Sequence, residues 1–246
     1  MSLPQRKILV SANPIETAAA LFSSTAMDAI GRRGWFITAL SGGSTPKKLF
    51  ERLTETPYRE AIEWKKVIFL WGDERSVPPS HPDSNFAMAN HALLAPLGIP
   101  SANIFRMEAE RGELEKAAAE YETRLRAKFL ELGLEKRIDL VLLGMGTDGH
   151  TASLFPGTKA LGENVKWVAA NEVPQLKTWR MTLTYPAINA ARKVVFLVTG
   201  SDKAGILKEV LSGVSDAQRL PSQAVLTPQG ETIWITDEAA GATLTR

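Results

Sequence analysis

Short, continuously apolar segments recur along this chain, and they limit the folds that it can adopt. VIFLW (67–71), LVLL (140–143) and VVFLV (194–198) contain no polar residue. Such runs are typical of strands that are buried on both faces of a parallel sheet. Longer segments with helical spacing lie between them, and this alternation predicts an α/β protein. We expect an open, mostly parallel, Rossmann-like sheet with helices on both faces, which is a three-layer αβα architecture.

The same patterns bear on the competing architecture, on the number of domains and on the individual elements. A closed eight-strand barrel is the competing architecture, and the uneven lengths of the βα units favour the open sheet. The chain has no glycine- or proline-rich linker and no internal repeat, so we expect a single domain over residues 1–246. The expected strands are 6–12, 35–40, 67–71, 102–107, 138–143, 165–170, 180–184, 193–199, 224–227 and 232–236, and the expected helices are 14–31, 45–54, 84–94 and 112–132.

Composition excludes several classes of function. The net charge is +2 and the basic residues are scattered, which argues against nucleic acid and against an anionic membrane surface as partners. The chain has no cysteine, so disulfides, thiolate metal sites and a cysteine nucleophile are excluded. No apolar run approaches the roughly 20 residues that cross a bilayer, and the N-terminal apolar stretch is too short for a secretion signal. We expect a soluble, cytoplasmic protein, and the sequence leaves its oligomeric state open.

Polar, glycine-containing segments follow four of the apolar strands directly. These segments are SGGSTP (41–46), GDERSVP (72–78), GMGTDGH (144–150) and TGSDK (199–203). In an open α/β sheet, ligands bind beyond the carboxyl ends of the strands. The four segments are therefore expected to meet at one edge of the sheet and to form a site there.

The segment SGGSTP leads from a strand into a helix. Gly42 and Gly43 allow an anion to approach the backbone, and the hydroxyls of Ser44 and Thr45 can assist the free N–H groups of the helix start. The segment lacks the lysine of a P-loop and the spacing of a dinucleotide fingerprint, so a single phosphate on a small molecule suits it better. A tight turn with a helix cap is the alternative interpretation.

Two further segments offer catalytic groups. In GDERSVP, Arg75 can bind a phosphate or carboxylate, Asp73 can orient a water, an imidazole or a sugar hydroxyl, and Glu74 is interpreted as an exposed surface charge. In GMGTDGH, His150 is expected at the start of a helix, where the positive end of the dipole disfavours imidazolium. A neutral imidazole can act as a general base, whereas a capping role is the alternative.

The remaining histidines do not indicate a metal site. His81 lies in a loop and His91 on an expected helix, and neither has another ligand at metal spacing, so both are interpreted as structural or surface residues. The chain also has no HExxH segment and no G-x-S-x-G elbow. We therefore expect neither a metal nor another cofactor.

Five motifs together resemble those of the 6-phosphogluconolactonases. They are SGGSTP, GDERSVP…HPDSN, GMGTDGHTASLFPG, RMTLTYPAIN and VTGSDKA, in this order over roughly residues 38–205. The resemblance implies the αβα fold that this family shares with glucosamine-6-phosphate deaminases and isomerases. It also implies hydrolysis of 6-phospho-D-glucono-1,5-lactone to 6-phosphogluconate, in the oxidative pentose phosphate pathway. His150 is then the acid/base residue with Asp73 and Arg75 nearby, and Lys177, Arg180 and Lys203 are candidates for phosphate contact.

The chemistry of a lactone agrees with these residues. A lactone is an activated ester, so one neutral imidazole can take a proton from the attacking water and later protonate the departing ring oxygen. We expect phosphate recognition to depend on Arg180 and Lys203, with Ser44 and Thr45, more than on Lys177. The predicted catalytic residues are His150 and Asp73, and the predicted substrate-binding residues are Gly42, Gly43, Ser44, Thr45, Arg75, Thr151, Lys177, Arg180 and Lys203.

Two other functions remain as alternatives. Deaminases and isomerases of this fold follow the histidine with a segment like FNEP, whose glutamate supports it, whereas this chain has SLFPG there. A non-catalytic sugar-phosphate-binding module would accompany a DNA-binding reader. Only about 35 residues precede the first glycine-loop strand, and an expected strand and helix use them. We therefore expect no DNA-binding reader.

Overall fold

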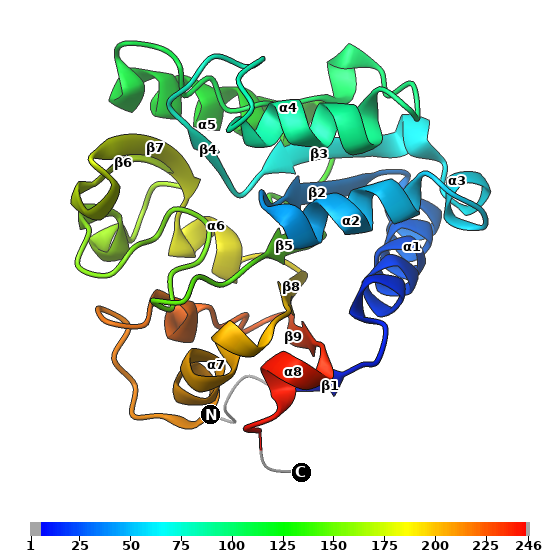
Figure 1. The fold of residues 1–246 in the computed structure, drawn as a ribbon. Coiled ribbons are helices and arrows are strands. Elements are labelled where there is room, and N and C mark those ends of the chain that lie inside the picture. Colours follow the sequence, from blue (N-terminus) through cyan, green and yellow to red (C-terminus); the bar gives the residue numbers. More distant parts are fainter. Residues whose placement is uncertain (1–5, 245–246) are drawn as a thin grey trace.

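The computed structural model describes residues 6–244, and a parallel six-stranded sheet forms its centre (Figure 1). Each pair of neighbouring strands in this sheet is parallel, as the continuous apolar runs predict. The strands lie in the order β1 (Arg6–Val10), β9 (Glu231–Thr236), β8 (Lys193–Val198), β5 (Leu140–Leu143), β2 (Phe36–Leu40) and β3 (Val67–Trp71).

Helices alternate with these strands along the chain. Helix α1 (Pro14–Arg33) begins as its sequence predicts, because the Asn13 side chain accepts a hydrogen bond from the N–H of Glu16 and proline occupies the first turn. The other helices are α2 (Ser44–Leu53), α3 (Tyr58–Ala61), α4 (Asn85–Ala89), α5 (Leu114–Glu131), α6 (Tyr185–Asn189), α7 (Ala204–Ser212) and α8 (Glu238–Gly241).

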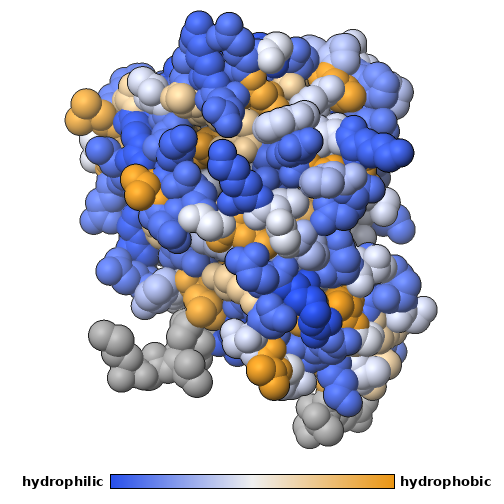
Figure 2. Space-filling model, turned by 90° about the vertical axis from the view of Figure 1, so that its left-hand side faces the viewer, coloured by the Kyte–Doolittle hydropathy of each residue, from blue (hydrophilic) through white to orange (hydrophobic). Residues whose placement is uncertain are grey.

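Every residue of β2, β3 and β5 is buried, on both faces of the sheet. Successive side chains of a strand point to opposite faces, so continuous burial requires cover on both sides. The predicted αβα architecture is therefore confirmed. Figure 2 shows an outer face on which hydrophilic residues predominate and hydrophobic ones are scattered. Within residues 6–244, the helices are too short or too polar to cross a membrane.

A second, antiparallel sheet has three strands, and the sequence did not predict it. It consists of β4 (Asp73–Arg75), β7 (Thr178–Leu183) and β6 (Val168–Val173), with β7 in the centre. The predicted strands 165–170 and 180–184 belong to this sheet and not to the parallel one. Residues 73–75, which were expected in a loop, are a strand because they pair with β7.

Two predicted strands are wrong. Over 102–107 the chain ends a 3₁₀ turn (Ser101–Asn103), pairs with β3 only at an isolated bridge between Ile104 and Phe69, and then continues without regular structure. Residues 224–227 form no strand. Their backbone groups bond instead to the side chain of Asn189, which donates to the carbonyl of Ala224 (3.0 Å) and accepts from the N–H of Leu226 (2.9 Å).

The predicted helix 84–94 begins as expected and ends differently. Ser84 caps α4 by accepting a hydrogen bond from the N–H of Ala87. The helix then widens into a π-helical turn over Asn90–Leu94.

The order of the strands reverses beside β2. Strand β3, the next in sequence, lies on one side of β2, and β5 lies on the other. The segments that follow β2 and β5 therefore leave the sheet next to each other, which is where open α/β sheets hold their ligands.

Candidate active site

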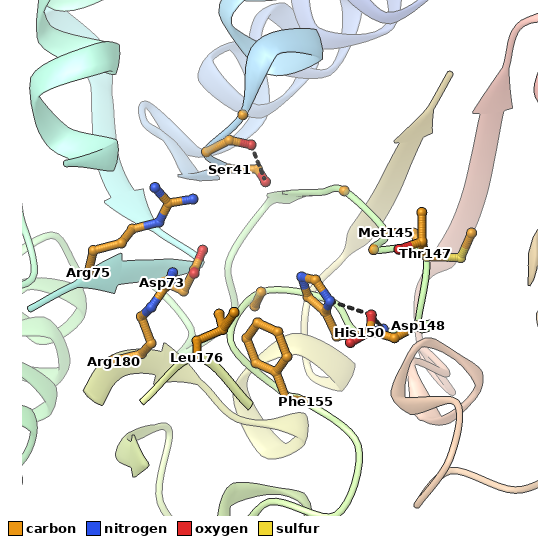
Figure 3. Close-up of a pocket in the computed structure, with 15 residues that line it drawn as sticks. Ser41, Asp73, Arg75, Met145, Thr147, Asp148, His150, Phe155, Leu176 and Arg180 are labelled. Atoms are coloured by element: carbon orange, nitrogen blue, oxygen red, sulfur yellow. Dashed lines mark hydrogen bonds and ion pairs between the residues drawn. The ribbon is translucent and has the colours of Figure 1, made fainter. Parts of the chain in front are cut away.

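A cavity of about 470 Å³ lies at the carboxyl ends of β2, β3 and β5. Its volume is in the range of small-molecule sites. Its walls come from four parts of the chain, as Figure 3 shows. They are the segment 41–43 after β2, Asp73 and Arg75 of β4, the segment after β5 with His150 and Phe155, and Leu176 and Arg180 of the β6–β7 hairpin.

The glycine segment after β2 forms one wall, and it leads into α2. Gly43 is the N-cap of α2 with φ +105°, and no side chain caps this helix. The first N–H groups of a helix have no partner within it, so those of α2 are available to an anion. Gly42 is required for a different reason, because a Cβ atom there would lie 1.9 Å from Oδ1 of Asn85.

The two arginines of the cavity lie opposite each other on β4 and β7, where Arg75 pairs with Arg180. The Nε atom of each is buried and has no hydrogen-bond partner within the described residues. Burial lowers the pKa of Arg180; among the nearby charges, Asp73 raises this pKa and Arg75, to a smaller extent, lowers it. The two guanidinium groups line the same cavity and together form a candidate site for an anion.

Strand pairing explains why Asp73 and Arg75 face the cavity while Glu74 does not. Alternate residues of a strand share a face, and Glu74 points the other way. The prediction that Glu74 is exposed is wrong, because it is only 3% exposed. Its carboxylate accepts hydrogen bonds from the hydroxyl of Ser84 and from the N–H groups of Asn85 and Phe86. Burial raises the pKa of Glu74, although these hydrogen bonds oppose the rise.

Asp73 is buried and firmly held. Its Oδ2 accepts a hydrogen bond from the hydroxyl of Ser153 (2.6 Å), and its Oδ1 accepts from Nδ2 of Asn85 (3.3 Å). The N–H of Ser153 donates in turn to the hydroxyl of Thr182 on β7 (3.1 Å). The segment that carries His150 is thus tied to the small sheet that carries the arginines.

His150 does not stand at the start of a helix, so this expectation is wrong. The segment after β5 is a compact turn in which the N–H of Gly146 donates to the carbonyl of His150 (2.9 Å). Gly149 has φ +79° there, and the hydroxyl of Thr151 donates to the carbonyl of Gly144 (2.8 Å). The imidazole therefore does not cap a helix that its own segment begins.

Asp148 supplies the partner that the sequence analysis missed. Its Oδ1 lies 2.5 Å from Nδ1 of His150 and also accepts the N–H of that residue. Partial burial would raise the pKa of Asp148, but the hydrogen bond and the charge of His150 outweigh it and lower the pKa. Nε2 of His150 has no hydrogen-bond partner within the described residues, and Figure 3 places the ring between Asp148 and the group of Asp73, Arg75 and Arg180. Such a pair fixes the tautomer of a general base.

The sequence contained one signal for Asp148, which is the spacing Asp-Gly-His. A carboxylate two residues before a histidine can reach its ring only if a tight turn separates them. Gly149, with its positive φ, provides that turn.

Six of the predicted site residues line this cavity and five do not. Gly42, Gly43, Asp73, Arg75, His150 and Arg180 line it, whereas Ser44, Thr45, Thr151, Lys177 and Lys203 do not.

Three of the five residues outside the cavity wall have surroundings that can be described. The Thr45 hydroxyl is paired with that of Thr199 at 2.9 Å. Nζ of Lys203 lies 3.5 Å from Oδ2 of Asp202. Lys177 follows a short 3₁₀ turn in a left-handed conformation, with φ +50°.

The other two histidines are exposed and lie outside the cavity. Across the described part of the chain, no three His, Asp or Glu side chains are grouped so that they could hold a metal ion.

Comparison with known proteins gives the family. A family model described as glucosamine-6-phosphate isomerases/6-phosphogluconolactonase matches residues 11–234. The chain belongs to this family. The resemblance predicted from the five motifs is thereby confirmed, and the αβα fold is that of the family.

Relatives within this family are similar over nearly the whole chain. The 6-phosphogluconolactonase of Synechocystis sp. is 42% identical over 98% of both chains. That of Nostoc sp. is 42% identical over 88% of both chains. Among solved structures, 6-phosphogluconolactonase from Trypanosoma cruzi has a TM-score of 0.85 and 31% identity, and the match covers 100% of this chain and 99% of that one.

Proposed function

We propose that this protein hydrolyses 6-phospho-D-glucono-1,5-lactone to 6-phosphogluconate, a reaction of the oxidative pentose phosphate pathway. The observation that carries the proposal is the position of the His150–Asp148 pair in one cavity with Arg75 and Arg180. A proton acceptor and an anion site thus face the same space. The names of the relatives in the family support the same reaction.

His150 acts as the general base. Its Nδ1 holds a proton in the hydrogen bond to Asp148, so Nε2 is free to accept a proton from water. The water attacks the C1 carbonyl, and the imidazolium that forms is stabilised by the Asp148 carboxylate. The same imidazolium then protonates the ring oxygen as the C1–O bond breaks, which opens the lactone and restores the neutral base.

The phosphate binds to the arginine pair. A phosphate ester carries up to two negative charges at neutral pH, and two guanidinium groups match it with charge-assisted hydrogen bonds. The bound phosphate places C1 near His150, which lines the same cavity. The free N–H groups at the start of α2 then remain for the oxygen that becomes negative at C1.

Asp73 has a supporting role in this proposal. Both of its oxygens already accept hydrogen bonds, from Ser153 and Asn85, but each carboxylate oxygen can accept a second one. A sugar hydroxyl of the substrate supplies that second donor.

A glucosamine-6-phosphate isomerase is the other activity that the family name includes. In the deaminases and isomerases that this fold resembles, a glutamate after the histidine supports it. Here Phe155 stands in the segment SLFPG, and no carboxylate follows His150 before Glu163. This difference favours the lactonase.

The decisive experiment supplies both substrates to the purified protein. We expect 6-phosphogluconate to form from the lactone faster than by spontaneous opening, which must be subtracted, and no ammonia to form from glucosamine 6-phosphate. The His150→Asn variant is the control for contaminating enzyme, and we expect it to be about 10²–10⁴-fold slower. Lactone opening at the uncatalysed rate would refute the proposal, and binding without turnover would indicate a sugar-phosphate-binding module.

A further inference from the structure

An aromatic ring lies against the imidazole of His150. The rings of Phe155 and His150 are stacked with their centroids 4.0 Å apart and their planes 20° from parallel. Figure 3 shows Phe155 beside His150 in the cavity wall. Phe155 is only 5% exposed, so the contact is shielded from water.

Gly146 confines the same imidazole at a second place. A Cβ atom on Gly146 would lie 2.1 Å from Nδ1 of His150 and 2.2 Å from Cε1. Any side chain at this position would therefore push the ring out of its place. Together with the hydrogen bond that Nδ1 donates to Asp148, these contacts form a slot around the ring, and Nε2 is the ring nitrogen that they leave free.

Phe155 is itself held in position. Its carbonyl accepts hydrogen bonds from the N–H (3.2 Å) and the hydroxyl (2.8 Å) of Thr158. Nδ2 of Asn171, on β6, donates to that hydroxyl at 3.0 Å. The carbonyl of Pro156 accepts from Nε2 of Gln175, in the β6–β7 hairpin, at 2.8 Å. The segment that carries Phe155 is thus fixed to the small sheet through Asn171 and Gln175.

We propose that Phe155 is a positioning residue that sets the plane of the His150 imidazole, so that Nε2 points at the attacking water. The inference rests on the proposed role of His150 as the base. Rotation about the Cβ–Cγ bond of histidine is soft, and a single hydrogen bond at Nδ1 leaves the ring free to tilt. The stacked Phe155 removes this freedom, and proton transfer needs such alignment because misplacement by about 1 Å can cost 10²-fold in rate.

The test compares a variant that keeps the aromatic ring with one that loses it. We expect Phe155→Leu to lower kcat about 10- to 100-fold and to change KM less than about threefold, because the arginine pair is untouched. We expect Phe155→Tyr to keep kcat within about threefold of the wild type, because its ring can stack as well. Phe129→Leu is the matched control, because Phe129 is fully buried against Trp167 and outside the cavity, and we expect its kcat to be unchanged.

A second measurement needs no substrate. The chain has three histidines, so the ring protons of His150 can be resolved by NMR and assigned with His150→Asn. The stacked Phe155 shifts these protons upfield. We expect them to move downfield in Phe155→Leu and to stay upfield in Phe155→Tyr and Phe129→Leu.

The outcomes separate this inference from the proposed function. A wild-type protein without lactone turnover would overturn the proposed function, and this inference with it. A wild-type protein that hydrolyses the lactone while Phe155→Leu has the same kcat would overturn this inference alone. Ring protons of His150 that do not respond to Phe155→Leu would also overturn it.

Discussion

Replacement of Asp148 by asparagine keeps the shape of this side chain and removes its charge. The amide oxygen of the new side chain can still accept hydrogen bonds from Nδ1 and from the N–H of His150, so the ring keeps its place. What is lost is the negative charge beside the imidazolium that forms when water is deprotonated. The substitution therefore separates the orientation of the base from its electrostatic stabilisation.

The size of the effect follows from the contact. A hydrogen bond to a charged group contributes about 1.5–3 kcal/mol and one between neutral groups about 0.5–1.5 kcal/mol, so loss of the charge alone removes about 1–1.5 kcal/mol. The Asp148 side chain is 45% exposed, so water screens part of the interaction and the lower part of this range applies. About 1 kcal/mol in the barrier corresponds to a fall of about fivefold in kcat. KM should change little, because Asp148 does not contact the arginine pair.

Initial rates of lactone opening, corrected for the spontaneous reaction, measure this effect. Asp28→Asn is the control, because Asp28 forms an exposed ion pair with Arg32 within α1 and lies outside the cavity. We expect wild-type kinetics from this control. Wild-type kcat in Asp148→Asn would refute the argument that the charge of Asp148 stabilises the imidazolium. A rise in KM with unchanged kcat would place Asp148 in substrate binding instead.

The same pair predicts how stability depends on pH. The folded-state pKa of Asp148 lies below its ordinary value of 3.8. A carboxylate of this kind stabilises the folded protein above the unfolded-state pKa, and the contribution is lost as the pH falls through the folded-state pKa. We expect the wild type to be more stable than Asp148→Asn at pH 5 and the difference to disappear as the pH falls below about 3.8. Urea unfolding of both proteins across this range measures the difference, and a difference that grows on acidification would contradict it.

Three further predictions concern other parts of the site. Arg180→Ala should raise KM about tenfold or more with a smaller loss in kcat, while Lys177→Ala should stay within about twofold of the wild type, because Arg180 lines the cavity and Lys177 does not. Steady-state kinetics measure both variants, and the opposite order would reverse the assignment. Glu74→Ala should lower the free energy of unfolding by about 2–4 kcal/mol in a denaturant titration, because three backbone N–H groups and a hydroxyl lose their acceptor. Activity should survive exhaustive treatment with EDTA, and a loss that added zinc restores would show that a metal takes part.

The parallel sheet and the location of the site could be predicted because their signals are local. Continuous apolar runs identify strands that are buried on both faces, and polar glycine segments after such strands identify the edge where ligands bind. These rules placed Gly42, Asp73 and His150 on one cavity although they are far apart in the sequence.

The small sheet could not be predicted in the same way. Residues 73–75 are charged and only three in number, so their composition resembles a loop. They become a strand because β7, about a hundred residues later, pairs with them. The error in the burial of Glu74 follows directly from this one, since the alternation of faces is known only when the strand is known.

The two sheets divide the chemistry of the site between them. The parallel sheet presents His150, the proposed base, and the first N–H groups of α2 on segments that follow buried strands, and the core fixes the positions of these strands. The small sheet brings Arg75 and Arg180 together at the cavity, with the carboxylate of Asp73 near them. Ser153 joins the two parts, because it donates to Asp73 and accepts from Asn171, which lies beside Arg180 in the pairing of β6 with β7. Buried hydrogen bonds thus fix the distance between His150 and the arginine pair, and in the proposed function a substrate is selected by whether its phosphate and its reacting carbon fit that distance.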